Sequence, residues 1–120
     1  MITLAFLAAA SMQAAQAPIQ WSETYWAAQR AFQSCYDRRI TRERRRGRSA
    51  QVILDRVMNR CRLEWDSRIV AMRADIRQQR PAWSEFTVND YLQWRYRDFY
   101  GDRLLRLRYA TGELHYPNIE

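Results

Sequence analysis

Apolar residues in two segments of the chain recur at spacings of three and four, the period that places them on one face of an α-helix. Each segment carries one of the two cysteines within its apolar stripe. The first stripe consists of Trp21, Tyr25, Ala28, Phe32 and Cys35, and the second of Leu54, Met58, Cys61, Trp65, Ile69, Met72 and Ile76. The pattern therefore predicts two amphipathic helices, each with a cysteine on its buried face.

The segment between the stripes predicts a tight turn. Gly47 suits the left-handed residue that ends a helix, and Ser49 suits the N-cap of the next one. We expect a first helix over residues 23–46, capped by Ser22, and a second over residues 50–79, which ends before Pro81. Because the connection is short, the two helices should pack as an antiparallel hairpin.

The cysteine positions test this hairpin independently. Residues that face each other across an antiparallel pair have a nearly constant sum, and Cys35 with Cys61 gives a midpoint at residue 48, inside the predicted turn. The same sum sets Phe32 against Glu64 or Trp65, and Ala28 against Arg68 or Ile69. In an exported chain, the simplest prediction is one Cys35–Cys61 disulfide, worth about 3.5 kcal/mol by chain entropy. A redox or metal pair is the alternative, but the spacing is not Cys-x-x-Cys.

A third helix is predicted to begin near Val88, with Thr87 as its N-cap. Its stripe of Val88, Leu92, Tyr96 and Phe99 should face the hairpin, and Trp94 falls towards its side. Past Gly101 two interpretations stand: the helix continues to a stop at Gly112, or residues 102–116 form a short β-hairpin. The fold class is thus all-α: a disulfide-stapled antiparallel helical hairpin with a third, aromatic-rich helix, and a short C-terminal β-hairpin as the variant. The aromatic residues that crowd this part are Trp83, Phe86, Tyr91, Trp94, Tyr96, Phe99, Tyr100, Tyr109 and Tyr116.

The first 17 residues differ from the rest of the chain. They carry no charged side chain, 13 of them are apolar, and they end in the small-x-small sequence Ala15-Gln16-Ala17. This favours a secretory signal peptide over residues 1–17 and one small domain over residues 18–120, in the periplasm or outside the cell. An uncleaved anchor and a misassigned start codon are the alternatives. No apolar run reaches the length of a membrane-spanning helix.

The charge is strongly concentrated at the predicted turn. The chain has a net charge of +7, and seven arginines fall within the eleven residues from 38 to 48: Arg38, Arg39, Arg42, Arg44, Arg45, Arg46 and Arg48. Guanidinium groups bind phosphate and carboxylate in a bidentate manner, so these residues form a candidate anion-binding site. A merely solvated helix end, whose cations complement the helix dipole, is the alternative.

Catalytic motifs are not evident. His115 is the single histidine, no serine lies in a Gly-x-Ser-x-Gly elbow, and the sequence carries no phosphate-binding glycine loop, metal-ligand cluster or cofactor motif. We therefore predict no catalytic residues, no metal and no cofactor, and a non-enzymatic protein. With Arg95 and Arg97 beside it, an exposed Trp94 is a candidate for stacking on a sugar or a partner.

The pattern Phe32-x-x-Cys35 with Val57-x-x-x-Cys61, one cysteine in each arm, resembles a loose class of small exported helical-hairpin proteins of Gram-negative bacteria. The resemblance covers residues 28–76 and implies a fold and a compartment, but no activity. The hypothesis that results is a periplasmic or secreted binding or structural module whose arginines contact an anionic envelope component or an acidic protein. A cytosolic nucleic-acid-binding protein is the alternative if the N-terminus does not direct export.

Overall fold

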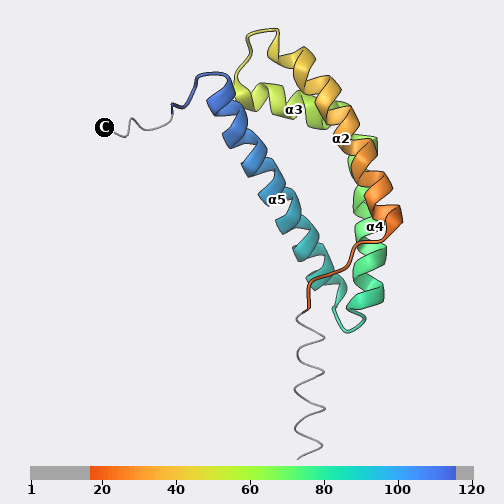
Figure 1. Cartoon of the computed structure of the whole chain (residues 1–120). Helices are drawn as coiled ribbons and strands as arrows, with labels where there is room; N and C mark the ends of the chain where they lie inside the picture. The colour runs from red at the N-terminus through yellow and green to blue at the C-terminus, as the bar shows by residue number, and fades with distance from the viewer. Residues whose placement is uncertain (1–16, 116–120) are drawn as a thin grey trace, which may run out of the picture.

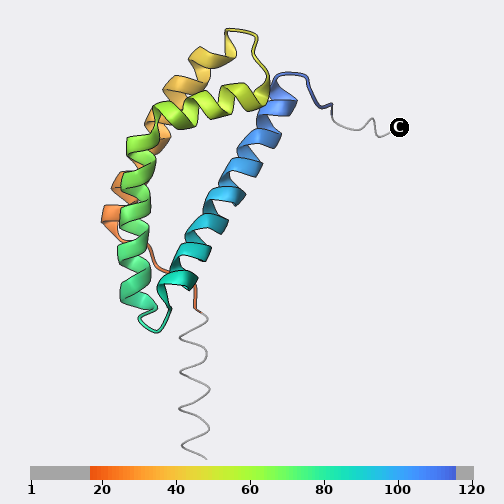
Figure 2. The same cartoon turned by 180° about the vertical axis from the view of Figure 1, so that it is seen from behind.

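The computed structural model describes residues 17–115, which are all-helical without a β-strand. The helices are α2 (Glu23–Arg44), α3 (Ala50–Arg60), α4 (Arg62–Gln79) and α5 (Glu85–Ala110). Helix α2 runs antiparallel to α3 and α4, and α5 returns from the end of α4 to the beginning of α3 (Figures 1 and 2). The predicted all-α hairpin with a third helix is confirmed. The predicted signal peptide lies, apart from Ala17, outside the described residues.

The predicted disulfide is present, and it fixes the register of the hairpin. Cys35 and Cys61 are bonded, with their Cα atoms 5.9 Å apart. Phe32 packs edge-on against Trp65 at a ring-centroid distance of 5.1 Å, which agrees with the predicted pairing. Gly47 has a φ of +65°, a left-handed conformation that favours glycine, so it turns the chain where the pattern placed the turn.

Serine side chains begin the hairpin helices as predicted. The Ser22 Oγ accepts a hydrogen bond from the Tyr25 N–H, and the Ser49 Oγ accepts one from the Val52 N–H. Asp75 of α4 adds a long-range anchor, because its buried carboxylate accepts bonds from both the N–H and the Oγ of Ser22. This contact ties the beginning of α2 to the end of α4.

The second predicted helix is wrong in one respect, because it is divided at Cys61. Cys61 has φ −102° and ψ 20°, so α3 ends before it and α4 begins after it. The helical hydrogen bonds on either side persist, from Cys61 N–H to Val57 and from Trp65 N–H to Cys61, so the chain bends without unravelling. No proline or glycine marks this point in the sequence. The bend is tertiary in origin: it lets α3 pack on both α2 and the C-terminal half of α5.

The predicted boundaries of the third helix also need correction. Ser84, not Thr87, is its N-cap: the Ser84 Oγ accepts from the Thr87 N–H at 3.1 Å, and the helix begins at Glu85. It passes through Gly101 and ends at Ala110, before Gly112 with a φ of +81°. Of the two interpretations for residues 102–116, the helix is confirmed up to Ala110. The β-hairpin is wrong over the described residues, since those after Ala110 form turns.

The buried apolar residues form two clusters along the hairpin. The cluster around the disulfide is built from Phe32, Cys35, Tyr36, Ala50, Ile53, Leu54, Val57, Met58, Cys61, Trp65 and Leu107. The cluster near the α4–α5 connection is built from Tyr25, Ala71, Met72, Ile76, Val88 and Leu92. Val88 and Leu92 are buried and Phe99 is half-buried against the disulfide cluster, so the predicted inward stripe of α5 is confirmed for these residues. On α4, Arg68 lies between Trp65 of the first cluster and Ala71 of the second.

Candidate functional site

The arginine tip, defined as the seven arginines from Arg38 to Arg48, lies at the C-terminal end of α2 and in the turn before α3. This turn is at one end of the molecule, and the chain enters the described part at the other end, near the α4–α5 connection (Figure 1).

Most of the tip arginines have no partner within the described part of the chain. Arg48 pairs with Glu43 at 2.7 Å, and the Arg38 Nε donates to the Ser34 carbonyl at 3.3 Å. Glu43 also accepts from Arg56 of α3 at 3.1 Å, so its charge is already shared. The remaining five, which form no ion pair or side-chain hydrogen bond among residues 17–115, are Arg39, Arg42, Arg44, Arg45 and Arg46.

The free guanidinium groups are accessible to a large ligand. Arg42, Arg44, Arg45 and Arg46 are exposed, and Thr41, Arg44 and Arg45 line a depression of about 280 Å³. Glu43 is the one carboxylate within residues 38–48, and Asp37 directly precedes them. The tip thus offers several exposed, unpaired guanidinium groups within a short stretch of chain, a donor set suited to phosphate or carboxylate groups on an extended anion.

Arg68 is the opposite case, because its guanidinium is buried. The residue is 6% exposed, and its Cζ lies 4.6 Å from the Trp65 ring centroid and 5.6 Å from that of Tyr25. Its Nη2 donates to the Tyr25 hydroxyl at 3.3 Å, whereas Nε and Nη1 are buried without a partner in the described structure. Burial lowers the pKa of Arg68, and the nearby charge of Arg95 lowers this pKa further.

A pocket opens beside this guanidinium, between α4 and α5. It has a volume of about 250 Å³ and is lined by Arg68, Arg95, Asp98, Phe99 and Asp102. The Arg95 guanidinium is held over the Trp21 ring at 5.6 Å, and Asp102 pairs with Arg106 at 3.1 Å. Arg68, Arg95 and Asp98 have no ion-pair partner among residues 17–115. We call this the Arg68 pocket.

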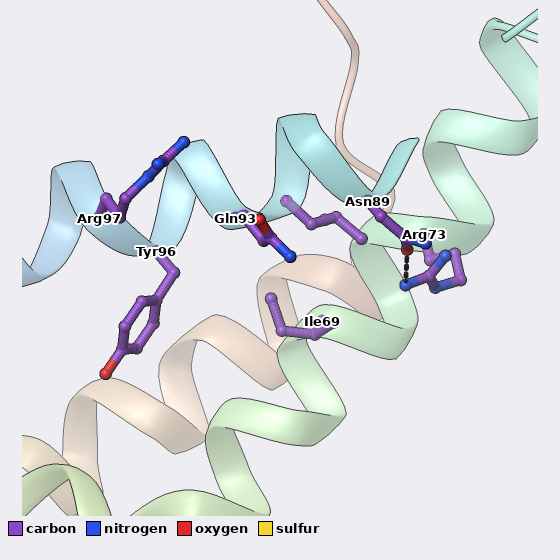
Figure 3. A pocket seen from close by; sticks show the side chains of 7 residues that line it. Ile69, Arg73, Asn89, Gln93, Tyr96 and Arg97 are labelled. Carbon is purple, nitrogen blue, oxygen red and sulfur yellow. Dashed lines mark hydrogen bonds between the residues drawn. The ribbon is translucent and has the colours of Figure 1, made fainter. Parts of the chain in front are cut away.

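A wider groove lies elsewhere between the same two helices (Figure 3). It has a volume of about 490 Å³, with Ile69 and Leu92 as its apolar part. Arg73 at one end is already engaged, because it donates to Asn89 at 2.8 Å and pairs with Glu85. Gln93 and Arg97 of α5 complete the polar rim. The guanidinium group at this end of the groove is thus paired with a carboxylate, unlike those of Arg68 and Arg95.

The remaining candidates are possible metal ligands, His115, Trp94 and membrane-spanning helices. Among residues 17–115, no group of three histidine, cysteine, aspartate or glutamate side chains is placed to hold a metal ion. His115 is exposed at the edge of the described chain. Trp94 is 51% exposed, in agreement with its predicted position at the side of α5, and its ring lies 6.1 Å from that of Tyr91. None of the described helices is both long and apolar enough to cross a membrane.

Sequence reasoning located the arginine tip but missed the Arg68 pocket. The register had placed Arg68 or Ile69 opposite Ala28, so the pattern already contained an arginine at a position that points into the hairpin. That signal was ambiguous by one residue, and it said nothing of Arg95 or Asp98 on α5.

Comparison of the chain with models of known families, with curated proteins and with solved structures gave no match.

Proposed function

We propose that this protein is a non-enzymatic periplasmic or secreted helical module whose arginine tip binds an anionic surface of the cell envelope. The observation that carries the proposal is the group of five tip arginines without a partner among residues 17–115. Phosphate-bearing headgroups on a membrane present an extended array of anions that several neighbouring guanidinium groups can contact at once, and each arginine near such a surface contributes about 1 kcal/mol.

The disulfide is compatible with this proposal in two ways. The disulfide joins α2 to the junction of α3 and α4, so it braces the helix that carries the tip. A disulfide persists most readily in an oxidising compartment, which fits export. The tip needs no cofactor and no enclosed pocket for this role, because exposed guanidinium groups are sufficient to bind phosphate groups.

The test is binding of the full chain to lipid vesicles. Vesicles that contain phosphatidylglycerol should bind the protein, and pure phosphatidylcholine vesicles should not. The triple variant Arg44→Gln, Arg45→Gln, Arg46→Gln should bind about 100-fold more weakly at low salt. Binding by the unaltered protein should fall steeply as salt rises, because the contacts are screened.

A matched control separates the tip from net charge. Arg60, Arg62 and Arg97 are exposed and lie outside the tip. Changing these three to glutamine removes the same charge and should change vesicle binding much less. Equal losses in the two triple variants would refute a localised site. Binding to duplex DNA that is tighter than binding to anionic vesicles, together with recovery of the native protein from the cytosol, would favour the nucleic-acid alternative instead.

A further inference from the structure

The Arg68 guanidinium is costly where it lies. Removing a cation from water is strongly unfavourable unless a charge or several hydrogen bonds compensate it. The rings of Trp65 and Tyr25 and one hydrogen bond to the Tyr25 hydroxyl offset part of this cost. Two of its three nitrogens remain buried and without a partner in the described structure. Such a group points to an anion that completes it.

Arg95 brings a second guanidinium group to the pocket from the neighbouring helix α5, and this group is only partly buried. Its guanidinium is positioned over Trp21, and it lines the Arg68 pocket without an ion pair among residues 17–115. Two arginines that face one pocket repel each other, as the effect of Arg95 on the Arg68 pKa indicates. A carboxylate between them would relieve the repulsion and accept a hydrogen bond from each.

The two aspartates that line the pocket, Asp98 and Asp102, indicate which class of ligand it accepts. Asp98 is exposed, lines the pocket and has no ion pair in the described structure, whereas Asp102 is engaged by Arg106. An unpaired carboxylate opposes a second negative charge on the ligand and favours an ammonium group. The volume of about 250 Å³ is below the roughly 300–1,000 Å³ of pockets for drug-sized ligands.

We infer that the Arg68 pocket binds a small amino carboxylate. Arg68 and Arg95 hold the carboxylate, and Asp98 receives the ammonium group. This site is separate from the arginine tip and does not depend on the proposed envelope binding. It is assembled from α4 and α5, with Trp21 and Tyr25 from the beginning of the hairpin supporting the two arginines.

The test is titration of the oxidised, full-length protein with glycine, sodium acetate and sodium sulfate at constant ionic strength. The readout is the shift of the tryptophan indole and arginine Nε–H resonances by NMR. Glycine should give saturable shifts, acetate weaker ones and sulfate the weakest. Arg68→Met should weaken glycine binding by about 10-fold or more, and Asp98→Asn should remove the preference for glycine over acetate.

Two controls keep the outcome decisive. Arg97→Met removes an exposed arginine of α5 that does not line this pocket, and the tip variant Arg44→Gln, Arg45→Gln, Arg46→Gln removes a distant charge. Both should bind glycine as the unaltered protein does. If Arg68→Met fails to fold, glycine binding by Arg95→Met tests the inference instead, since this variant removes the other guanidinium that donates to the ligand carboxylate. The absence of saturable shifts with glycine and acetate, or equal losses in Arg68→Met and Arg97→Met, would overturn the inference.

Discussion

The arginine tip and the Arg68 pocket both contain guanidinium groups without an ion-pair partner in the described structure, yet the lack of a carboxylate has opposite consequences in the two places. At the tip, Arg44, Arg45 and Arg46 are exposed, so water solvates their charge at little cost. Arg68 is 6% exposed, and water does not solvate its buried nitrogens. The unpaired charges at the tip therefore cost the folded state little, whereas the buried charge of Arg68 is unfavourable unless the carboxylate of a bound ligand compensates it.

The two regions also differ in how they are assembled. The tip arginines lie within eleven consecutive residues, so their proximity is guaranteed by the chain itself. The Arg68 pocket unites Arg68 with residues that lie 27 to 34 positions further along the chain, on a helix that must be packed correctly against α4. Changes in tertiary structure should therefore affect the pocket before the tip.

The largest expected effect comes from removing the disulfide. The double variant Cys35→Ala, Cys61→Ala should lose about 3.5 kcal/mol of the free energy of unfolding, because the unfolded chain regains the entropy of a 26-residue loop. Urea unfolding followed by circular dichroism measures the loss, and reduction of the unaltered protein should give a similar value. Glycine binding in the pocket should fall more than vesicle binding at the tip. The reverse order would contradict the expectation that the pocket depends more than the tip on tertiary structure.

Arg68→Met should raise the free energy of unfolding in chloride buffer by about 1 kcal/mol. The gain from removing a buried, uncompensated charge exceeds the lost contacts with the Trp65 and Tyr25 rings. Thermal unfolding measures the change, and Arg97→Met, at an exposed position, should change stability by less than about 0.5 kcal/mol. A large destabilisation by Arg68→Met would mean that the ring contacts alone compensate the charge.

Tyr100→Phe should lower the free energy of unfolding by about 1 kcal/mol, since the Tyr100 hydroxyl donates to Asp55 at 2.6 Å and joins α5 to α3. Burial and this hydrogen bond raise the pKa of Tyr100 from 10.0 to about 12. The folded state thus favours the neutral phenol, so the contribution is full below pH 10 and is lost as pH rises towards 12. The unaltered protein should therefore lose its higher free energy of unfolding, relative to Tyr100→Phe, as pH rises from 10 to 12. Phenolate absorbance should show a late-titrating tyrosine that the variant lacks.

The smallest effect on stability is expected at the tip. Arg44→Gln, Arg45→Gln, Arg46→Gln should change the free energy of unfolding by less than about 0.5 kcal/mol, because exposed charges without partners contribute little to the folded state. Urea unfolding measures this change beside the vesicle assay described above. A loss above 1 kcal/mol would show that the tip is a structural element, and it would remove the contrast with Arg68.

The amino-acid sequence by itself determined the features that depend on local pattern. Apolar spacing and the cysteine midpoint predicted the hairpin, the Cys35–Cys61 disulfide and the turn at Gly47, because helical period and a short connection leave one register that buries both stripes. The sequence also located the arginine tip, since its members are neighbours in the chain. The N-cap of α5 was misplaced by three residues, because Ser84 and Thr87 both carry side chains suited to that position.

Only the tertiary structure decided the bend at Cys61 and the composition of the Arg68 pocket. The bend occurs at a residue with no local signal, because its cause is the packing of α3 on two other helices. The predicted pairing set either Arg68 or Ile69 opposite Ala28, so the sequence did not decide which of the two is buried. Whether Arg95 and Asp98 come close to Arg68 depends on how α5 crosses the hairpin. Side-chain pattern specifies which face of a helix is buried, whereas the crossing of three helices specifies which charges meet there.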